Sequence, residues 1–279
     1  MRRIYTLAVL LLFVLSVSAQ QLHILHTSDT HSRIEPISPE AADTYAGMGG
    51  VVRRATFVKQ YRDKHPEMLL LDCGDISQGT PYYNFFQGEL EVKMMNLMGY
   101  DAMTIGNHEF DFGLDNMARL FRMATFPVVC SNYDVTGTVL EGLVKPYIVL
   151  ERNGAKIGIF GLSPKMEGLV QASKCEGVVY NDPIAVAQEM ADLLKEKEGC
   201  DVVICLSHLG FSSSKPDDPS DENLITKTRN IDLVLGGHSH TFMEKPVVYP
   251  NADGLEIPLL HTGKSGIYVG EMVLTLTKK

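Results

Sequence analysis

The chain has 279 residues, of which 21% are charged, and a formal net charge of -9. This acidity argues against a nucleic acid polymer as the ligand, although bound cations would still allow an acidic protein to hold phosphate. The five cysteines match neither a zinc motif nor a disulfide framework, so we expect them to be unpaired and structural.

The first 19 residues have the pattern of a secretory signal peptide. Two arginines precede an apolar run over 7–17, and the Val-Ser-Ala sequence at 17–19 fits a cleavage site. The run is shorter than the ~20 residues that a membrane-spanning helix needs. We therefore predict a signal peptide over 1–19, a catalytic domain over 20–279, and a periplasmic or secreted protein without integral membrane association.

Beyond this segment, apolar runs alternate with helical patterns. An Asn-Gly pair at 153–154 predicts a hairpin, and the polar stretch 212–222 predicts an exposed loop. Helix-separated strands combined with hairpins indicate an α/β fold with a mixed sheet. Strands are predicted over 22–27, 68–72, 102–105, 128–130, 147–151, 156–162, 202–207 and 231–236, with three more after Pro246, and helices over 49–64, 89–98, 114–123 and 184–196.

Residue types that bind metals follow five of these strands directly. Because open α/β sheets bind ligands at the carboxyl ends of their strands, we expect these residues at one edge of one sheet. A single histidine in such a turn could be structural, but five of the nine histidines lie there. The residues are Asp29, His31, Asp75, Asn107, His108, His208, His238 and His240, whereas His23, His26, His65 and His261 are expected to be structural.

This mixture of carboxylate, amide and imidazole groups indicates the chemistry. It suits divalent zinc, manganese, iron or cobalt, and the absence of thiolates argues against a structural zinc site. Seven ligands are too many for one tetrahedral ion but suit two ions that share a carboxylate. Such a pair can hold a phosphoryl group and generate hydroxide at neutral pH.

Five motifs in order resemble those of the calcineurin-like metallophosphoesterases. Within that group, residues 22–277 resemble the catalytic domain of the 5'-nucleotidase, UDP-sugar hydrolase and 2',3'-cyclic-nucleotide phosphodiesterase family. The resemblance implies a four-layer αββα sandwich of two mixed sheets with helices on both outer faces. The motifs are Asp29-x-His31, Gly74-Asp75-x-x-Gln78-Gly79, Gly106-Asn107-His108-Glu109-Phe110-Asp111, Ser207-His208-x-Gly210 and Gly236-Gly237-His238-Ser239-His240-Thr241.

The resemblance also implies a role for each residue. His108 would face the phosphate and stabilise charge on it, and Asp111 would orient His108 and keep it protonated. An alternative for Asp111 is the N-cap of the helix over 114–123. The implied ligands are Asp29, His31 and His240 for the first metal, Asn107, His208 and His238 for the second, and Asp75 for both.

The expected function is therefore an exported, 5'-nucleotidase-like phosphohydrolase that uses a metal-bound hydroxide on a nucleotide or another phosphate ester. Cyclic-nucleotide phosphodiesterase, UDP-sugar hydrolase and sulfur-ester hydrolase are alternative activities. The family's C-terminal specificity domain is expected to be absent, so a separately encoded partner would supply the nucleotide-binding contacts. A different class of function is a binding subunit, in which the chain would mainly dock such a partner. A local pocket lined by Tyr82, Tyr83 and Phe110 would instead make the chain self-sufficient.

Overall fold

The computed structural model describes residues 20–215 and 218–276, so the signal peptide predicted over 1–19 lies outside the described residues. Two six-stranded sheets form the centre of the fold. In spatial order, the first sheet contains β14 (Gly270–Leu276), β1 (Gln20–Thr27), β2 (Leu69–Asp72), β3 (Ala102–Thr104), β4 (Val128–Val129) and β6 (Val144–Lys145). The second contains β12 (Val247–Pro250), β13 (Glu256–His261), β11 (Leu233–Gly236), β10 (Val202–Ser207), β8 (Ala155–Leu162) and β7 (Tyr147–Arg152).

Both sheets are mixed, as predicted. From β1 to β6 the strands of the first sheet are parallel, and β14 joins β1 antiparallel. In the second sheet β13, β11, β10 and β8 are parallel, whereas β12 and β7 pair antiparallel at the edges. The predicted Asn-Gly turn joins β7 to β8. A small third sheet pairs β5 (Tyr133–Asp134) with β9 (Val179–Tyr180).

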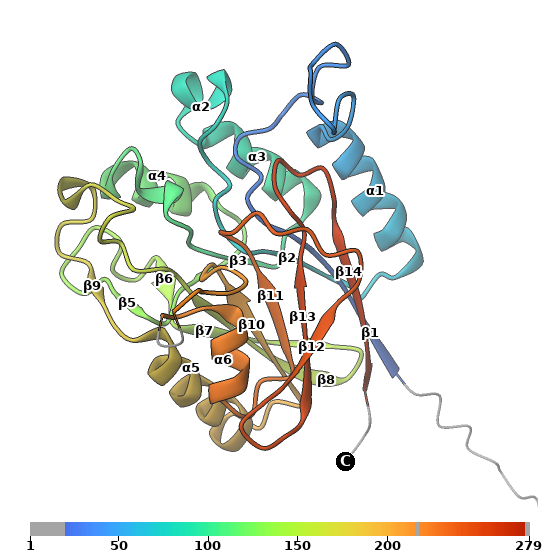
Figure 1. Cartoon of the computed structure of the whole chain (residues 1–279), viewed down its shortest axis with the longest axis vertical. Coiled ribbons are helices and arrows are strands. Elements are labelled where there is room, and N and C mark those ends of the chain that lie inside the picture. The colour runs from blue at the N-terminus through green and yellow to red at the C-terminus, as the bar shows by residue number, and fades with distance from the viewer. Residues whose placement is uncertain (1–19, 216–217, 277–279) are drawn as a thin grey trace, which may run out of the picture.

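Helices cover the outer face of each sheet (Figure 1). The first sheet is covered by α1 (Val51–Lys64), α3 (Glu89–Met98) and α4 (Leu114–Met123), and the short α2 (Pro81–Phe86) precedes α3. The second is covered by α5 (Pro183–Asp192), the π-helical turn over Leu193–Lys197, and α6 (Asp221–Lys227). Two short 3₁₀ turns, His108–Phe110 and Ala172–Lys174, complete the elements. The four-layer αββα sandwich is therefore confirmed.

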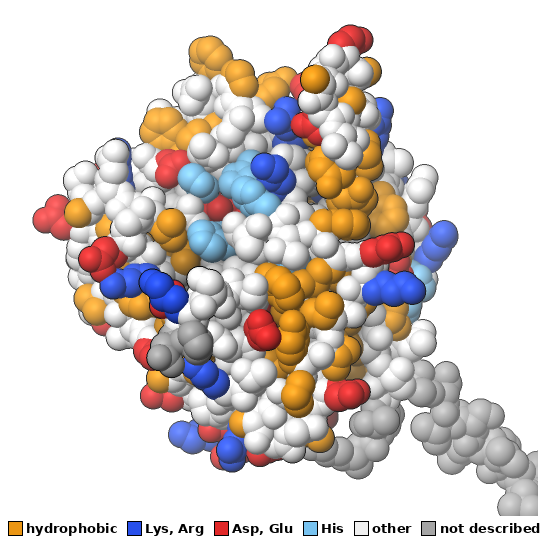
Figure 2. Space-filling view, in the orientation of Figure 1, with side chains coloured by type: hydrophobic (Ala, Val, Ile, Leu, Met, Phe, Trp, Pro, Cys, Tyr) orange, Lys and Arg blue, Asp and Glu red, His pale blue; other side chains and the backbone are white. Residues whose placement is uncertain are grey.

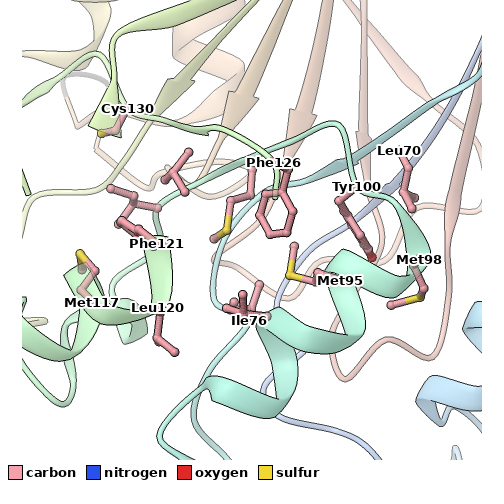
Figure 3. Close-up of a cluster of buried hydrophobic side chains, with 14 of the residues drawn as sticks. Leu70, Ile76, Met95, Met98, Tyr100, Met117, Leu120, Phe121, Phe126 and Cys130 are labelled. Carbon is pink, nitrogen blue, oxygen red and sulfur yellow. The ribbon is translucent and has the colours of Figure 1, made fainter. Parts of the chain in front are cut away.

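Alternation along the strands builds the layers, because successive side chains of a strand point to opposite faces. In β2, Leu70 packs toward the outer helices, whereas Leu69 and Leu71 pack between the two sheets. Figure 3 shows the outer layer, where Met95 and Met98 of α3 and the residues of α4 meet Tyr100 and Phe126 beneath them. This double packing fixes the strands whose ends carry the polar residues.

Several elements match the sequence predictions, and a few do not. The bounds of α3, α4 and β10 are the predicted ones. The helix α2 was missed because its six residues are too few to show a period. Part of the predicted loop is also wrong, since Ser220 caps α6 by accepting a hydrogen bond from the Asn223 N–H. All five cysteines are unpaired, as expected.

Candidate metal centre

The predicted ligands meet at one end of the molecule, but not at the edge of a single sheet. The strands β1, β2 and β3 belong to the first sheet, whereas β10 and β11 belong to the second. The expectation that all ligands lie at the edge of one sheet was therefore wrong. The alternation of strands and helices along a sequence does not show which strands belong to the same sheet. The carboxyl ends of both sets of strands point to the same place, where Figure 2 shows histidine side chains gathered on the surface.

Six of the seven predicted ligands form two compact groups. The ligand atoms of Asp29, His31 and His240 lie within 4.8 Å of one another, and we call these residues the first group. Those of Asp75, His208 and His238 also lie within 4.8 Å of one another and form the second group. This division matches the two ligand sets that the motifs implied, with Asp75 beside the second set.

In the first group, two imidazole nitrogens face each other. The Nδ1 atom of His31 lies 3.2 Å from the Ser77 carbonyl oxygen, which leaves Nε2 free to point inward. That Nε2 lies 2.9 Å from Nε2 of His240. Both nitrogens lie near Oδ1 of Asp29, at 4.0 Å and 3.5 Å. Two nitrogens and a carboxylate that converge in this way are arranged to share a cation.

The second group contains buried polar atoms without hydrogen-bond partners. His208 is fully buried, and its Nδ1 atom donates to the Cys73 carbonyl oxygen at 2.6 Å. Its Nε2 lies 3.0 Å from Oδ2 of Asp75 but in a direction that makes no hydrogen bond. Oδ1 of Asn107 is also buried and unpartnered. Orphaned buried groups are rare, and an imidazole nitrogen and an amide oxygen are both able to coordinate a divalent cation.

The backbone of the ligand-bearing turns is strained. Five of the predicted ligands have left-handed φ angles of 48° to 71°, a region that residues other than glycine adopt at a cost of about 1–3 kcal/mol each. Hydrogen bonds between the turns hold this conformation, such as those from the N–H groups of Asp29 and His31 to the carbonyls of Gly74 and Asp75. The five are Asp29, His31, Asp75, His238 and His240.

Two motif glycines allow the turns to approach each other. A Cβ atom at Gly106 would lie 2.2 Å from Oδ1 of Asp75. A Cβ atom at Gly237 would lie 3.0 Å from Oδ2 of Asp29. The first distance leaves no room for a side chain, and the second is tighter than ordinary van der Waals contact, with Nδ1 of His208 at 2.9 Å from the same Cβ position. Both positions therefore favour glycine, because ligand side chains pass directly over the backbone.

Burial and neighbouring charges shift the pKa values of the predicted ligands. Burial lowers the pKa of both His31 and His238 to about 4, which keeps these imidazoles neutral. Burial also raises the pKa of Asp29 to about 6. Burial opposes charge on His208 and Asp75 too, but their mutual attraction prevails. It raises the pKa of His208 to about 10 and holds that of Asp75 below its usual value.

His108 stands beside the ligands and belongs to neither group. Its ring centroid is 5.4 Å from that of His31, and its Nδ1 atom lies 2.9 Å from Oδ2 of Asp111. This hydrogen bond raises the pKa of His108. The N-cap of α4 is Gly113, so the alternative that Asp111 caps this helix was wrong. The geometry fits a protonated imidazole, held by Asp111, at the rim of the site.

Glu109 is a residue whose role the sequence analysis did not identify. Its buried carboxylate accepts hydrogen bonds from the backbone N–H groups of Asp75, Ile76 and Gly106, at 2.9, 2.9 and 2.6 Å. Burial raises its pKa to about 7. It joins the turn after β2 to the turn after β3. The sequence did contain one signal for this role. Glu109 is an acidic residue within a motif, and the backbone N–H groups of the neighbouring turns need hydrogen-bond acceptors.

The residues expected to line a local pocket, and the four histidines expected to be structural, belong to neither ligand group. Phe110 and Tyr83 are 0% and 6% exposed, so the proposed local pocket lined with Tyr82 was wrong. The remaining four histidines are outside both ligand groups. His261, for example, is buried against Asp221, with Nε2 2.7 Å from Oδ2.

Comparison with known proteins identifies the family. The family model described as calcineurin-like phosphoesterase matches residues 22–242. The chain belongs to this family. It is 35% identical to a snake venom 5'-nucleotidase of Crotalus adamanteus, over 92% of the chain and 46% of the relative. It is 33% identical to the human 5'-nucleotidase, over 95% of the chain and 48% of the relative. The chain thus spans about half the length of the curated relatives it matches.

Solved structures agree. The crystal structure of a 5'-nucleotidase precursor from Thermus thermophilus matches with a TM-score of 0.83 and 30% identity, over 92% of this chain and 51% of that one. The calcineurin-like phosphoesterase YfkN of Bacillus subtilis matches with a TM-score of 0.76 and 29% identity, over 94% of this chain and 87% of that one. The phosphoesterase fold and the predicted family are therefore confirmed.

Proposed function

We propose that the chain hydrolyses phosphate esters at a centre of two divalent metal ions. The observation that carries this proposal is the pair of ligand groups at the strand ends, together with the buried, unpartnered Nε2 of His208 and Oδ1 of Asn107. Asp29, His31 and His240 would hold one ion, and Asn107, His208 and His238 the other. Asp75 would contact both ions. Two such ions supply an activated water and stabilise negative charge on the phosphoryl group.

The remaining residues have separate tasks in this proposal. Protonated His108 donates a hydrogen bond to the phosphoryl oxygens or to the leaving oxygen, which stabilises charge as it develops. Asp111 orients the ring through Nδ1, so that Nε2 faces the substrate. Glu109 keeps the turns that carry Asp75 and Asn107 in register. Full burial of His208 shields its side of the second group from bulk solvent.

For the substrate, we infer a nucleotide, and a nucleoside 5'-monophosphate first. The support is the name 5'-nucleotidase, which several relatives carry. Cyclic nucleotides and nucleotide sugars are the alternative substrates. Because the match covers about half of those relatives, nucleoside contacts from a second domain or a separate partner belong to the same proposal. A binding module that docks such a partner without catalysis is the competing class.

A substrate panel tests these statements. The purified chain is assayed on an aryl phosphate, a nucleoside 5'-monophosphate, a 2',3'-cyclic nucleotide and a nucleotide sugar, with added Mn²⁺, Zn²⁺ or Co²⁺ and after chelation. We expect metal-dependent turnover of the aryl phosphate and weak discrimination among the others. A protein that binds metal yet turns over none of them is a binding module. A strong preference for the nucleotide without any partner would contradict the partner hypothesis.

We also propose export, on the strength of the signal-peptide pattern. Among residues 20–215 and 218–276, no helix is long and apolar enough to cross a membrane. Mass spectrometry of the protein from its native envelope or secreted fraction should find an N-terminus at or near Gln20. Recovery of protein with Met1 from the cytoplasm would contradict export.

A further inference from the structure

A row of three residues crosses the end of the second sheet beside the ligand turns. Ser207 of β10 lies in register with Gly236 of β11, and Gly236 lies in register with His261 of β13. The residues two positions earlier on these strands pack in the outer hydrophobic layer, so Ser207, Gly236 and His261 face the same side. The row therefore faces the helices α5 and α6 (Figure 1).

The carboxylate of Asp221 bridges the two ends of this row. Asp221 is the first residue of α6 and is 0% exposed. The Ser207 hydroxyl donates a hydrogen bond to its Oδ1, and Nε2 of His261 lies 2.7 Å from its Oδ2. A Cβ atom at Gly236 would clash with both Nε2 of His261 and Oδ2 of Asp221. The carboxylate and the imidazole therefore occupy the space over the one residue of the row that has no side chain.

Through Ser207, this carboxylate fixes the chain around His208. The Ser207 oxygen that donates to Asp221 also accepts a hydrogen bond from the Leu209 N–H at 3.2 Å. The Asp221 N–H donates to the Gly210 carbonyl at 2.9 Å. His208 is therefore placed between residues that are bound to Asp221 either directly or through one hydroxyl.

Through His261, the same carboxylate contacts the chain on both sides of His238. Gly236, over which the carboxylate and the imidazole lie, precedes His238 by two residues. On the other side, the His261 ring meets the ring of Phe211 edge-on, with centroids 5.9 Å apart. The Phe211 N–H in turn donates to Oγ of Ser239 at 3.1 Å. Both imidazoles of the second group therefore have neighbours that are tied to this carboxylate.

Packing of α6 alone does not call for a carboxylate at this position. Leu224 and Ile225 of the same helix already pack against the second sheet. An apolar side chain in place of Asp221 would add to that packing without the free-energy cost of burying a carboxylate. A buried carboxylate with two hydrogen bonds instead restricts direction, because hydrogen bonds weaken steeply away from linear geometry. The network is therefore suited to holding the ligand turns in one orientation.

We propose that Asp221 is a positioning residue of the second metal-ion site. Through Ser207 and His261 it holds His208 and His238 in the orientation that binds the ion, although it contacts neither the ion nor the substrate. This inference rests on the proposed two-metal function and adds a support from the second sheet. Removal of such a support typically lowers metal affinity by about 10–100-fold.

Co²⁺ binding tests this role without any substrate. The purified chain is stripped of metal, and Co²⁺ is returned in competition with a chelator while its absorption reports the bound ions. Asp221→Ala removes both hydrogen-bond acceptors. We therefore expect the tighter Co²⁺ site, which we assign to the more buried second group, to weaken by about 10–100-fold while the other site keeps its affinity. Asp221→Asn retains an oxygen for His261 and an NH₂ group that can donate to Ser207, so it should keep most of the affinity.

Thr228→Val is the matched control, because it removes a buried hydroxyl from the other end of α6. This hydroxyl donates to the Leu224 carbonyl at 2.7 Å, within the helix itself. Urea midpoints of the metal-free proteins should fall for Thr228→Val and Asp221→Ala alike, but only Asp221→Ala should change the Co²⁺ affinity. If Asp221→Ala does not fold, Ser207→Ala removes one hydroxyl of the same network and should weaken the tighter site in the same direction.

The outcomes separate this inference from the proposed function. If the unaltered chain binds fewer than two Co²⁺ ions, the two-metal function itself fails. If it binds two, but Asp221→Ala and Ser207→Ala lower only the urea midpoint, the inference is overturned. Equal weakening of both sites, or equal losses in Asp221→Asn and Asp221→Ala, would also show that Asp221 does not position the second group.

Discussion

The two ligand groups differ in how firmly the fold holds them. In the second group, Asp75 and His208 are 2% and 0% exposed. Their ring and backbone atoms are fixed by hydrogen bonds to Cys73 and Glu109. In the first group, the side chain of His240 is 36% exposed. Among the described residues, nothing but the facing His31 nitrogen forms a hydrogen bond with its ring.

This contrast suggests a division of labour between the groups. Most of the second group has its geometry set before any ion binds, because buried hydrogen bonds fix the ring of His208 and the carboxylate of Asp75. The first group is completed by His240, which lies on a strained turn and is exposed to solvent. We therefore expect the ion of the first group to exchange first during chelation. The substitutions below either affect one of the two ligand groups or change a residue that belongs to neither group.

Asp75→Asn should have the largest effect. Its carboxylate faces His208 and accepts the His108 N–H, and we propose that it contacts both ions. An amide there removes the buried negative charge that faces His208 and the proposed ions. We expect loss of both metals and a fall in rate of more than about 100-fold, beyond that typical for outer-shell substitutions. Elemental analysis and aryl phosphate turnover measure this. Nearly full metal content with a normal rate would contradict the assignment.

His108→Ala should separate rate from metal binding. The imidazole is proposed to act on the substrate, whereas its backbone N–H, which the substitution retains, contacts Asp75. We expect both metals to remain and kcat to fall by roughly 10²–10⁴-fold, the range for a lost general acid or charge-stabilising group. Parallel metal analysis is the control. Stoichiometric loss of one metal would show that His108 is a ligand.

Glu109→Gln should weaken the second group selectively. The substituted amide still has one oxygen acceptor, but its NH₂ group would point at a backbone N–H that now lacks a partner. Outer-shell changes of this kind cost about 10–100-fold in metal affinity or activity. In a chelator titration of the unaltered chain, the first group should lose its metal at a lower chelator concentration than the second group. In Glu109→Gln, we expect these two chelator concentrations to lie closer together. Unchanged, well-separated steps would show that Glu109 does not support the second group.

The sequence predicted the ligands better than it predicted their supports. Asp75 or His238 can be recognised because each follows a strand and a motif glycine, and both features are local. The division of five strands between two sheets depends on packing between distant segments, such as the layer that Leu69 and Leu71 form with the second sheet. Glu109 was missed for the same reason, since its three N–H partners are fixed only after β2 and β3 pair side by side.

The smallest effect on catalysis is expected for Asp72→Asn, three residues from Asp75 and outside both groups. Asp72 is 1% exposed, and it accepts hydrogen bonds from the Thr27 hydroxyl at 2.6 Å and the Gly74 N–H at 2.9 Å. An asparagine can keep the second bond and donate to Thr27. Metal content and turnover should therefore stay within about twofold of those of the unaltered chain. Substitutions that remove no buried charge partner or hydrogen bond usually have small effects.

Stability should nevertheless change, because burial raises the pKa of Asp72 to about 7. A carboxyl whose folded pKa lies above its unfolded value of 3.8 binds its proton more tightly when folded. Its contribution is therefore present at low pH and is lost as pH rises from about 4 to 7. Asp72→Asn removes this slope, so denaturant midpoints should favour the variant at pH 8 and converge with the unaltered chain near pH 4. If the variant instead loses metal as Asp75→Asn does, the turn after β2 depends on Asp72 as well, and the boundary drawn around the second group is wrong.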